Sequence, residues 1–259
     1  THLGVGAHQD DLEVMALHGI LACYKQPQKW FGGVTVTNGA GSSRTNEYAD
    51  YTDEQMQAVR AEEQRKAAVV GEFGFVAQLG YPSSTVKQPG NSDFAADLRM
   101  ILAATKPEVV YTHNLADKHD THVAVVVPLI RALREMPAAE RPVEVYGVEV
   151  WRDLNWLLDD EKVLLDMANR PNLVRALISI FDSQISGGKR YDLALEGRLR
   201  SNATFFDSHA VDDMTLASYA MDLKPLVDEP SLDIVKYVDG YVERFREDVR
   251  SRVSRFTGD

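Results

Sequence analysis

Short apolar segments alternate with helix-forming segments through most of this 259-residue chain. The pattern predicts strands at residues 3–7, 33–36, 75–79, 107–112 and 143–150, and helices at residues 13–24, 52–70, 94–104 and 123–133. Such alternation is typical of a parallel sheet with helices on both faces. We therefore predict an α/β fold with a Rossmann-like, doubly wound and mostly parallel sheet.

The last part of the chain is predicted to be more helical. Helices are expected at residues 162–181, 192–199 and 234–256, whereas the polar, Gly-rich or Pro-rich segments 37–43 and 80–91 are expected to be loops. We find no internal repeat, no low-complexity tract and no second domain boundary. One domain is expected over residues 1–259, with the core sheet and the site in about residues 1–155. A helical C-terminal extension over about residues 156–259 would pack on the sheet and flank the substrate.

Charge and composition exclude several classes of partner. Lys and Arg total 28 against 39 Asp and Glu, for a formal net charge of −11, so nucleic acid is not expected to bind. No apolar run reaches the roughly 18 residues of a membrane span. Cys23 is the only cysteine, so no internal disulfide is expected and a reducing, cytoplasmic location is compatible. Because the first residue is Thr1 and not methionine, removal of a targeting peptide, and hence secretion, stays open.

The first predicted strand ends in polar side chains that packing alone does not explain. His8 and Asp11 are three residues apart across a strand-to-helix turn. That spacing lets an imidazole nitrogen and a carboxylate oxygen converge on one cation. Asp10, between them, is expected to point elsewhere and to be free for another role.

A second polar cluster follows the strand at residues 107–112, and it consists of His113, Asn114, Asp117, His119, Asp120 and His122. The carboxyl ends of parallel strands lie at one edge of a sheet, so His8, Asp11 and the His119/His122 pair can meet there. Two imidazoles and one carboxylate leave a coordination position open on zinc. An open position marks a catalytic metal, because structural zinc sites use four protein ligands.

Such a site predicts hydrolysis by activated water. Bound zinc lowers the pKa of its water to about 7 and polarises a carbonyl group. A carboxylate that is not a ligand can accept the proton as attack begins, and Asp10 is placed for that role. An imidazole from either His119 or His113 can stabilise the oxyanion that develops.

Each signal alone has an ordinary explanation. An Asp-Asp pair is most often a solvated turn or a helix cap, and His-x-x-His on a helix occurs by chance in many proteins. Their joint position after two apolar strands favours the metal site. Gly39 and Gly41 miss the spacing of phosphate-binding loops and are expected to line a pocket. Arg60 is compatible with a surface position on its helix.

Two motifs resemble those of a known family. Residues 7–13, Ala-His-Gln-Asp-Asp-Leu-Glu, resemble the A-H-P-D-D-x-E signature of the PIG-L/LmbE family of zinc-dependent de-N-acetylases. Residues 119–122, His-Asp-Thr-His, resemble its H-P-D-H motif. Gln9 replaces the proline of the first motif, whereas the residues that correspond to the metal ligands are retained.

The resemblance implies a role for each site residue. The implied zinc ligands are His8, Asp11 and His122, although another divalent transition metal is compatible. Asp10 would be the general base and His119 the group that stabilises the oxyanion. Arg60 would lie at the pocket rim as a substrate contact.

The expected activity is that of a metal-dependent amidase that removes an N-acetyl or other N-acyl group from a small molecule. An N-acetylated amino sugar or its glycoside is the expected substrate, and a homo-oligomer is compatible with the family. One alternative is a hydratase or lyase, because a relative on the same fold adds water to a carbon–carbon double bond. Another alternative is a metal-binding protein without catalytic activity. Asp10 argues against this alternative, because metal binding alone needs no carboxylate besides those that bind the metal.

Overall fold

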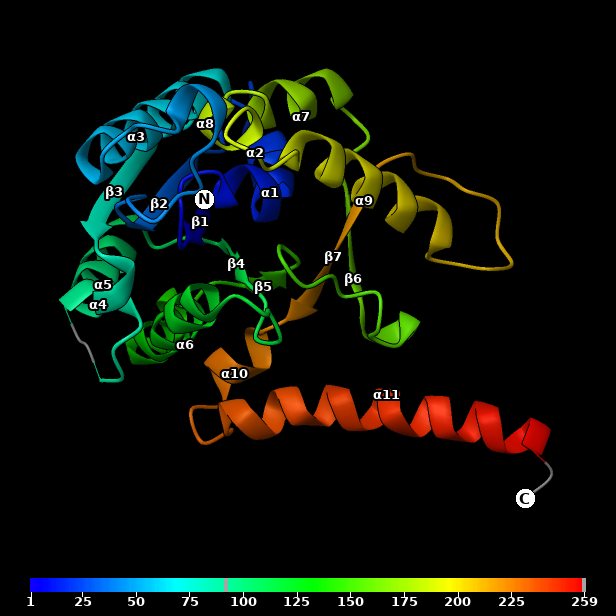
Figure 1. The fold of residues 1–259 in the computed structure, drawn as a ribbon. Coiled ribbons are helices and arrows are strands. Elements are labelled where there is room, and N and C mark those ends of the chain that lie inside the picture. The colour runs from blue at the N-terminus through cyan, green and yellow to red at the C-terminus, as the bar shows by residue number, and fades with distance from the viewer. Residues whose placement is uncertain (91–92, 258–259) are drawn as a thin grey trace.

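Residues 1–90 and 93–257, which the computed structural model describes, contain a seven-stranded sheet with the order β3-β2-β1-β4-β5-β7-β6 (Figure 1). The strands are β1 (His2–Gly6), β2 (Phe31–Thr37), β3 (Phe75–Tyr81), β4 (Val109–His113), β5 (Glu144–Val148), β6 (Val163–Asp166) and β7 (Ala217–Asp222). Strands β1 to β5 are parallel, and β7 is antiparallel to both of its neighbours, β5 and β6. The predicted α/β class and mostly parallel sheet are confirmed.

Helices cover both faces of the sheet (Figure 1). One face carries α1 (Asp11–Met15), α2 (Leu17–Cys23), α3 (Asp53–Val70), α7 (Pro171–Ile178), α8 (Asp182–Ile185) and α9 (Tyr191–Phe205). The other carries α4 (Ser83–Val86), α5 (Asp93–Thr105), α6 (Asp120–Glu135), α10 (Lys224–Asp228) and α11 (Ile234–Thr257). Short 3-10 turns lie at η1 (Asn46–Tyr48), η2 (Ala138–Glu140) and η3 (Asp159–Glu161).

Alternate side chains along each strand supply two apolar cores. Val5 and Val110 belong to the core beneath α6, together with Leu129 of that helix. Tyr111, the next residue of β4, belongs to the opposite core with Ile20 of α2. This period of two is the side-chain geometry of a strand that is buried on both faces. The two cores hold the central strands in place, and thereby the loops at their ends.

The prediction of a single helix over residues 162–181 is wrong. That segment contains β6, which pairs with β7, followed by α7, which begins with Pro171 at its first turn. The short apolar run at residues 163–165 is compatible with either a helix or a strand. In the structure it pairs with β7, a strand that the sequence pattern did not predict, and this pairing favours the strand. Because β6 and β7 join the same sheet, the sheet is not confined to residues 1–155.

Two further expectations differ from the structure. The helix expected at residues 13–24 is divided into α1 and α2 at Ala16, whose φ of −102° and ψ of 11° depart from helical values. The loop expected at residues 80–91 contains α4, and residue 91 lies outside the described residues.

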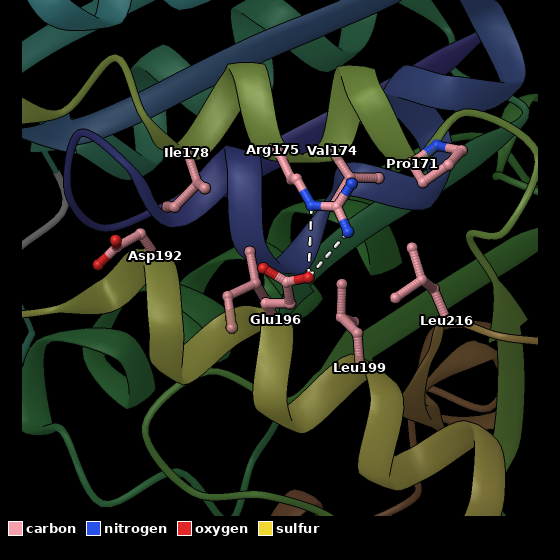
Figure 2. A pocket seen from close by; sticks show the side chains of 9 residues that line it. Pro171, Val174, Arg175, Ile178, Asp192, Glu196, Leu199 and Leu216 are labelled. Carbon is pink, nitrogen blue, oxygen red and sulfur yellow. Dashed lines mark hydrogen bonds and ion pairs between the residues drawn. The ribbon is translucent and has the colours of Figure 1, made fainter.

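The helices α7 and α9 pack side by side, and an ion pair between Arg175 and Glu196 joins them, with Nη2 and Oε1 2.9 Å apart (Figure 2). The hollow between them is bounded by Pro171, Leu199 and Leu216 and has a volume of about 20 Å³. A space of that size holds about one water molecule. It is a packing defect and too small for a substrate.

The last helix, α11, runs along the edge of the molecule (Figure 1). Near its start it is attached to the sheet, because the hydroxyl group of Tyr237 donates a hydrogen bond of 2.6 Å to the carbonyl oxygen of Asp222 in β7. Its later apolar residues, such as Val253 and Phe256, are exposed. None of the helices in residues 1–90 and 93–257 is long and apolar enough to cross a membrane.

A close approach between β1 and α1 depends on Gly6. A Cβ atom added at this position would lie 2.9 Å from Cβ of Asp11 and 3.3 Å from Cε of Met15. Side-chain atoms do not pack at 2.9 Å, so any residue larger than glycine would push the first turn of α1 away from the strand.

We expect Gly6→Ala to lower the free energy of unfolding by about 1–3 kcal/mol, the usual cost of overpacking a core. Urea unfolding measured by circular dichroism tests this. Gly197→Ala is the matched control, because Gly197 lies in α9 with open space around it and alanine there should stabilise by about 0.5–1 kcal/mol. Equal stability of the two variants would contradict the proposed close approach.

Candidate active site

The two polar clusters lie at the point where the chain reverses its direction through the sheet. From β1 the chain moves outward to β2 and β3, then returns to β4 on the other side of β1. The carboxyl ends of β1 and β4 are therefore neighbours, and the loops that leave them diverge. Open α/β sheets bind ligands at such a switch point. Residues 8–11 follow β1, and residues 114–122 follow β4.

The turn between β1 and α1 has a strained backbone at Asp10. This residue has a φ of 88°, in the left-handed region, and it occupies the position before the first residue of α1. Asp11 then begins the helix, and its Oδ2 accepts a hydrogen bond of 2.6 Å from the backbone N–H of His8. A residue other than glycine in this region costs about 1–3 kcal/mol, which the surrounding contacts must offset. The turn directs the two adjacent carboxylates to different places.

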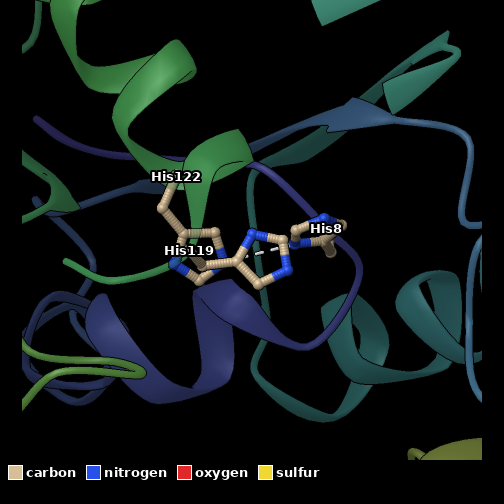
Figure 3. Close-up of side chains that lie close together, drawn as sticks. All are labelled: His8, His119 and His122. Atoms are coloured by element: carbon tan, nitrogen blue, oxygen red, sulfur yellow. Dashed lines mark hydrogen bonds between the residues drawn. The ribbon is translucent and has the colours of Figure 1, made fainter. Parts of the chain in front are cut away.

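Three predicted ligands converge on one point. Nδ1 of His8 lies 3.1 Å from Oδ2 of Asp11 and 3.3 Å from Nε2 of His122, and that Nε2 lies 3.5 Å from Oδ1 of Asp11. Figure 3 shows the rings of His8, His119 and His122 gathered at one point, His8 from the loop after β1 and the other two from the start of α6. A tetrahedral ion with bonds of about 2.0–2.1 Å separates its ligand atoms by about 3.3 Å. The measured distances are close to that value, although the two distances from Asp11 involve different carboxylate oxygens. Among the described residues, the donor atoms of two overlapping sets lie within 4.8 Å of one another: His8 with His119 and His122, and Asp11 with His113 and His122. The cluster therefore has the donor types and spacing that a divalent transition metal needs.

Asp117 holds His122 in the orientation that this arrangement requires. Its Oδ2 lies 3.2 Å from Nδ1 of His122, which leaves Nε2 of the ring directed at Asp11 and His8. The same oxygen accepts a hydrogen bond of 3.2 Å from the backbone N–H of Trp151, and Oδ1 accepts one of 3.0 Å from that of His119. Burial lowers the pKa of His122 to about 4, so the ring is neutral near pH 7 and keeps a lone pair for a metal.

The two remaining histidines occupy different positions. Nε2 of His113 accepts a hydrogen bond of 2.9 Å from the backbone N–H of Ala7, so its lone pair is already used, and the ring is fully buried behind Asp11. His119 lines the open cavity, with its ring stacked on His122 at 4.5 Å between centroids. Burial lowers the pKa of His119 as well. Of the two rings, His119 is the one that can reach a bound molecule.

Asp10 lies against Arg60 at the floor of the cavity. Nη2 of Arg60 is 3.3 Å from Oδ2 of Asp10 and also donates a hydrogen bond to the backbone carbonyl of Gln9. Burial raises the pKa of Asp10 to about 6, while the positive charge of Arg60 acts in the opposite direction. Arg60 is only 2% exposed, so it is buried. The surface position that the sequence allowed for this residue is not the one it has.

The helix α8 supports Arg60 from the other side. The ring of Phe181 lies 5.8 Å from the guanidinium carbon. Glu63, one turn after Arg60 on α3, accepts hydrogen bonds of 2.7 Å and 2.6 Å from the backbone N–H and the hydroxyl group of Ser183. These contacts join α3 to α8 and hold Arg60 beneath Asp10.

A cavity of about 700 Å³ opens above these side chains. Its floor is formed by His8, Asp10, Asp11, Arg60 and His119, and Gly39 and Gly41 line it as the sequence predicts. That volume lies within the usual range for small-molecule sites. The remaining wall comes largely from residues 150–198.

Sequence reasoning did not single out several residues that shape the site. Asp117 was noted only as part of a cluster, although its place five residues before His122, in the loop that leads into α6, was a usable signal. Trp151, Lys189 and Arg198 line the cavity from distant parts of the chain. No local motif marks them, and only the three-dimensional fold brings them to the site.

Comparison with known proteins identifies a matching family and similar folds. Residues 3–133 match the family model described as PIG-L, GlcNAc-PI de-N-acetylase. The N,N'-diacetylchitobiose deacetylase of Pyrococcus horikoshii has a TM-score of 0.66 and 15% identity over 85% of this chain and 82% of that one. A conserved protein of Thermus thermophilus has a TM-score of 0.61 and 19% identity, with 85% of this chain and 93% of that one covered.

A third similar structure has a different activity. The 4-carboxy-2-hydroxymuconate hydratase of Pseudomonas putida has a TM-score of 0.62 and 17% identity, with 86% of this chain and 95% of that one covered. At such identities the likeness concerns the fold. The curated proteins compared with the sequence give no significant match.

We expect Asp117→Asn to weaken zinc binding by about 10–100-fold, because the carboxylate that orients His122 would be replaced by a neutral amide. Competition with a chromophoric zinc chelator measures the affinity. Asp160→Asn, at an exposed aspartate in η3, is the control and should bind zinc as the parent does. An affinity of the Asp117 variant within twofold of the parent would exclude the orienting role.

Proposed function

The chain belongs to the PIG-L family of GlcNAc-PI de-N-acetylases, as its two motifs predict, and on that premise we propose that it is a zinc-dependent amide hydrolase. Its substrate would be an N-acetylated amino sugar, such as N-acetylglucosamine, or a glycoside of one. The observation that carries the proposal is the convergence of His8, Asp11 and His122 beside a carboxylate, Asp10, that is not needed as a ligand. Zinc or a similar divalent transition metal suits this set.

The three converging side chains would hold the ion. Their donor atoms are one carboxylate and two neutral imidazoles, which leave room for water and for the substrate carbonyl group. When bound, zinc supplies Lewis-acid polarisation and a water of lowered pKa. Asp117 keeps the ring of His122 directed at the ion through Nδ1.

Asp10 would act as the general base. Its carboxylate accepts a proton as water attacks the carbonyl carbon of the acetamido group, and a carbon–oxygen bond forms. The same group then returns the proton to the nitrogen as the carbon–nitrogen bond breaks, so that acetate and a free amine leave. Arg60, 3.3 Å from Oδ2, holds the carboxylate in place. Arg60 also lines the cavity, which is compatible with a direct substrate contact.

His119 would stabilise the negative charge that develops on the carbonyl oxygen. Its ring lies beside His8, with 4.9 Å between the centroids, and borders the cavity. A neutral imidazole donates one N–H group, so protonation of the ring is not required.

A hydratase is the second candidate, because a hydratase is among the similar structures. Asp10 could equally take a proton from water that adds to a carbon–carbon double bond. The products separate the two reactions, since only amide hydrolysis releases an amine and acetate. A screen of N-acetylated sugars with a primary-amine reagent therefore decides between them.

We expect Asp10→Ala to bind zinc with unchanged stoichiometry and to lose at least about 100-fold in kcat, because the base is removed while the ligands remain. His122→Ala should lose both metal and turnover. Metal content by plasma mass spectrometry and amine release are the two measurements, with Asp160→Ala as the control for an exposed aspartate. Undiminished turnover in either site variant would refute the assignment.

A further inference from the structure

The peptide group between Gln9 and Asp10 is bound at both of its polar ends by α3. We propose that Gln64, together with Arg60, clamps this peptide and thereby holds the carboxylate of Asp10 in place for its role as the base. Gln64 would be a positioning residue, which acts on the reaction only through Asp10. The inference rests on the proposed hydrolase activity, and Gln64 belongs to neither of the two motifs at residues 7–13 and 119–122.

Two side chains of α3 bind the two ends of the peptide. The backbone N–H of Asp10 donates a hydrogen bond of 3.3 Å to Oε1 of Gln64. The backbone carbonyl of Gln9, in the same peptide group, accepts a hydrogen bond from Nη2 of Arg60. Residues 60 and 64 are four apart and therefore lie on one face of α3. Because the peptide group is planar, these two bonds fix its orientation.

Gln64 is held in turn by α1. Its Nε2 donates a hydrogen bond of 2.8 Å to Oε1 of Glu13. Gln64 and Glu13 are both fully buried, so water does not compete for these contacts. A backbone N–H can only donate, so that of Asp10 must meet the oxygen of the Gln64 side chain, and the nitrogen is left for Glu13. The side-chain amide therefore connects the turn at Asp10 with the helix that follows.

The clamp acts at the strained residue of the turn. Asp10 has a φ of 88°, and such a conformation persists only where the surrounding structure holds it. A half-turn of the peptide plane would bring this φ to about −90°, which is an ordinary value. It would also leave a buried N–H and a buried carbonyl without their partners, which is costly. The two bonds to α3 therefore keep the peptide in its strained orientation.

The orientation of the peptide decides where Arg60 lies. Its Nη2 contacts the carbonyl oxygen of Gln9 and also lies 3.3 Å from Oδ2 of Asp10. If the peptide turned, an N–H group would face the guanidinium group in place of the oxygen, and two donors would oppose each other. Arg60 would then lose the position from which it holds the carboxylate. Gln64 thus affects Asp10 through the peptide and through Arg60.

The residue at position 9 leaves the turn without a constraint of its own. The family motif has proline there, and the proline ring fixes φ, whereas glutamine has no such restriction. The side chain of Gln9 instead donates a hydrogen bond of 3.0 Å from Nε2 to the carbonyl oxygen of Thr37 at the end of β2. The turn of this chain is therefore held by its contacts with β2 and α3.

The helix that carries the clamp is itself anchored. In β3, Nε2 of Gln78 donates a hydrogen bond of 2.9 Å to the backbone carbonyl of Ala61. Glu63 accepts two hydrogen bonds from Ser183 at α8. Residues 61 and 63 lie between the two clamping residues, so this part of α3 is fixed both to the sheet and to α8.

Gln64→Met tests the clamp, because methionine has a similar length but no amide group. We expect kcat to fall at least about 10-fold while KM stays within about twofold, since the substrate contacts remain and only the base is misplaced. Zinc affinity, measured with a chelator, should stay that of the parent, because the three ligands are unchanged. Tyr237→Phe is the matched control, since it removes a hydrogen bond to Asp222 outside the cavity and should leave kcat unchanged.

Exchanging the two partners tests whether the hydrogen bonds carry the effect. In the double variant Gln64→Glu with Glu13→Gln, the amide at position 13 donates to the carboxylate at position 64, which still accepts from the N–H of Asp10. Both hydrogen bonds are restored, so kcat should recover to within about threefold of the parent. Gln64→Glu alone places two carboxyl groups against each other and should be impaired. This pair of variants decides the question if Gln64→Met does not fold.

Amide exchange tests the clamp without turnover. In metal-free protein with isotope-labelled aspartate, NMR should show the N–H of Asp10 exchanging at least about 10-fold faster in Gln64→Met than in the parent, because its acceptor is gone. The N–H of Asp222, in β7, is the internal control and should exchange equally in both proteins. Faster exchange at Asp10 alone supports the clamp even if no N-acetylated sugar is turned over, a result that defeats only the proposed hydrolase activity.

Three results overturn the inference. One is equal exchange of the Asp10 N–H in the parent and in Gln64→Met. Another is an undiminished kcat of Gln64→Met, or a double variant that stays as impaired as Gln64→Glu alone. The last is a zinc affinity that falls in parallel with kcat, because Gln64 would then act on the metal ligands and not on the base.

Discussion

The convergence of one carboxylate and two imidazoles at the end of β1 is the constraint on which the rest of the site depends. Asp11 reaches His8 and His122 only because α1 begins directly against the strand, and Gly6 allows that approach. His122 comes from the first turn of α6, more than a hundred residues later, and the parallel pairing of β1 with β4 places it there.

Much of this site could be predicted from the sequence because its signals are local. Short apolar, β-prone segments predicted β1 and β4, and the polar residues directly after them could only lie at the same sheet edge. The antiparallel strand β7 could not be predicted in this way, because its partners β5 and β6 are more than fifty residues away along the chain. Without that partner, the apolar run of β6 was assigned to a helix.

The environment of a side chain was harder to predict than its position. Arg60 reads as a surface residue on a polar helix, yet it is buried between Asp10 and Phe181. Its burial follows from the docking of α8, which the sequence of α3 alone does not reveal. Tertiary contacts of this kind leave no periodic pattern in the sequence.

The position of β7 has a consequence for how the chain is made. The strand β6 is joined to the rest of the sheet only through β7, which is synthesised some fifty residues later. During translation, β5 therefore emerges from the ribosome with an open edge, and β6 has no partner until β7 appears. Unpaired strand edges promote association between chains. The interval between the two strands is thus a period in which the nascent chain carries two strand edges, of β5 and β6, without their final partner.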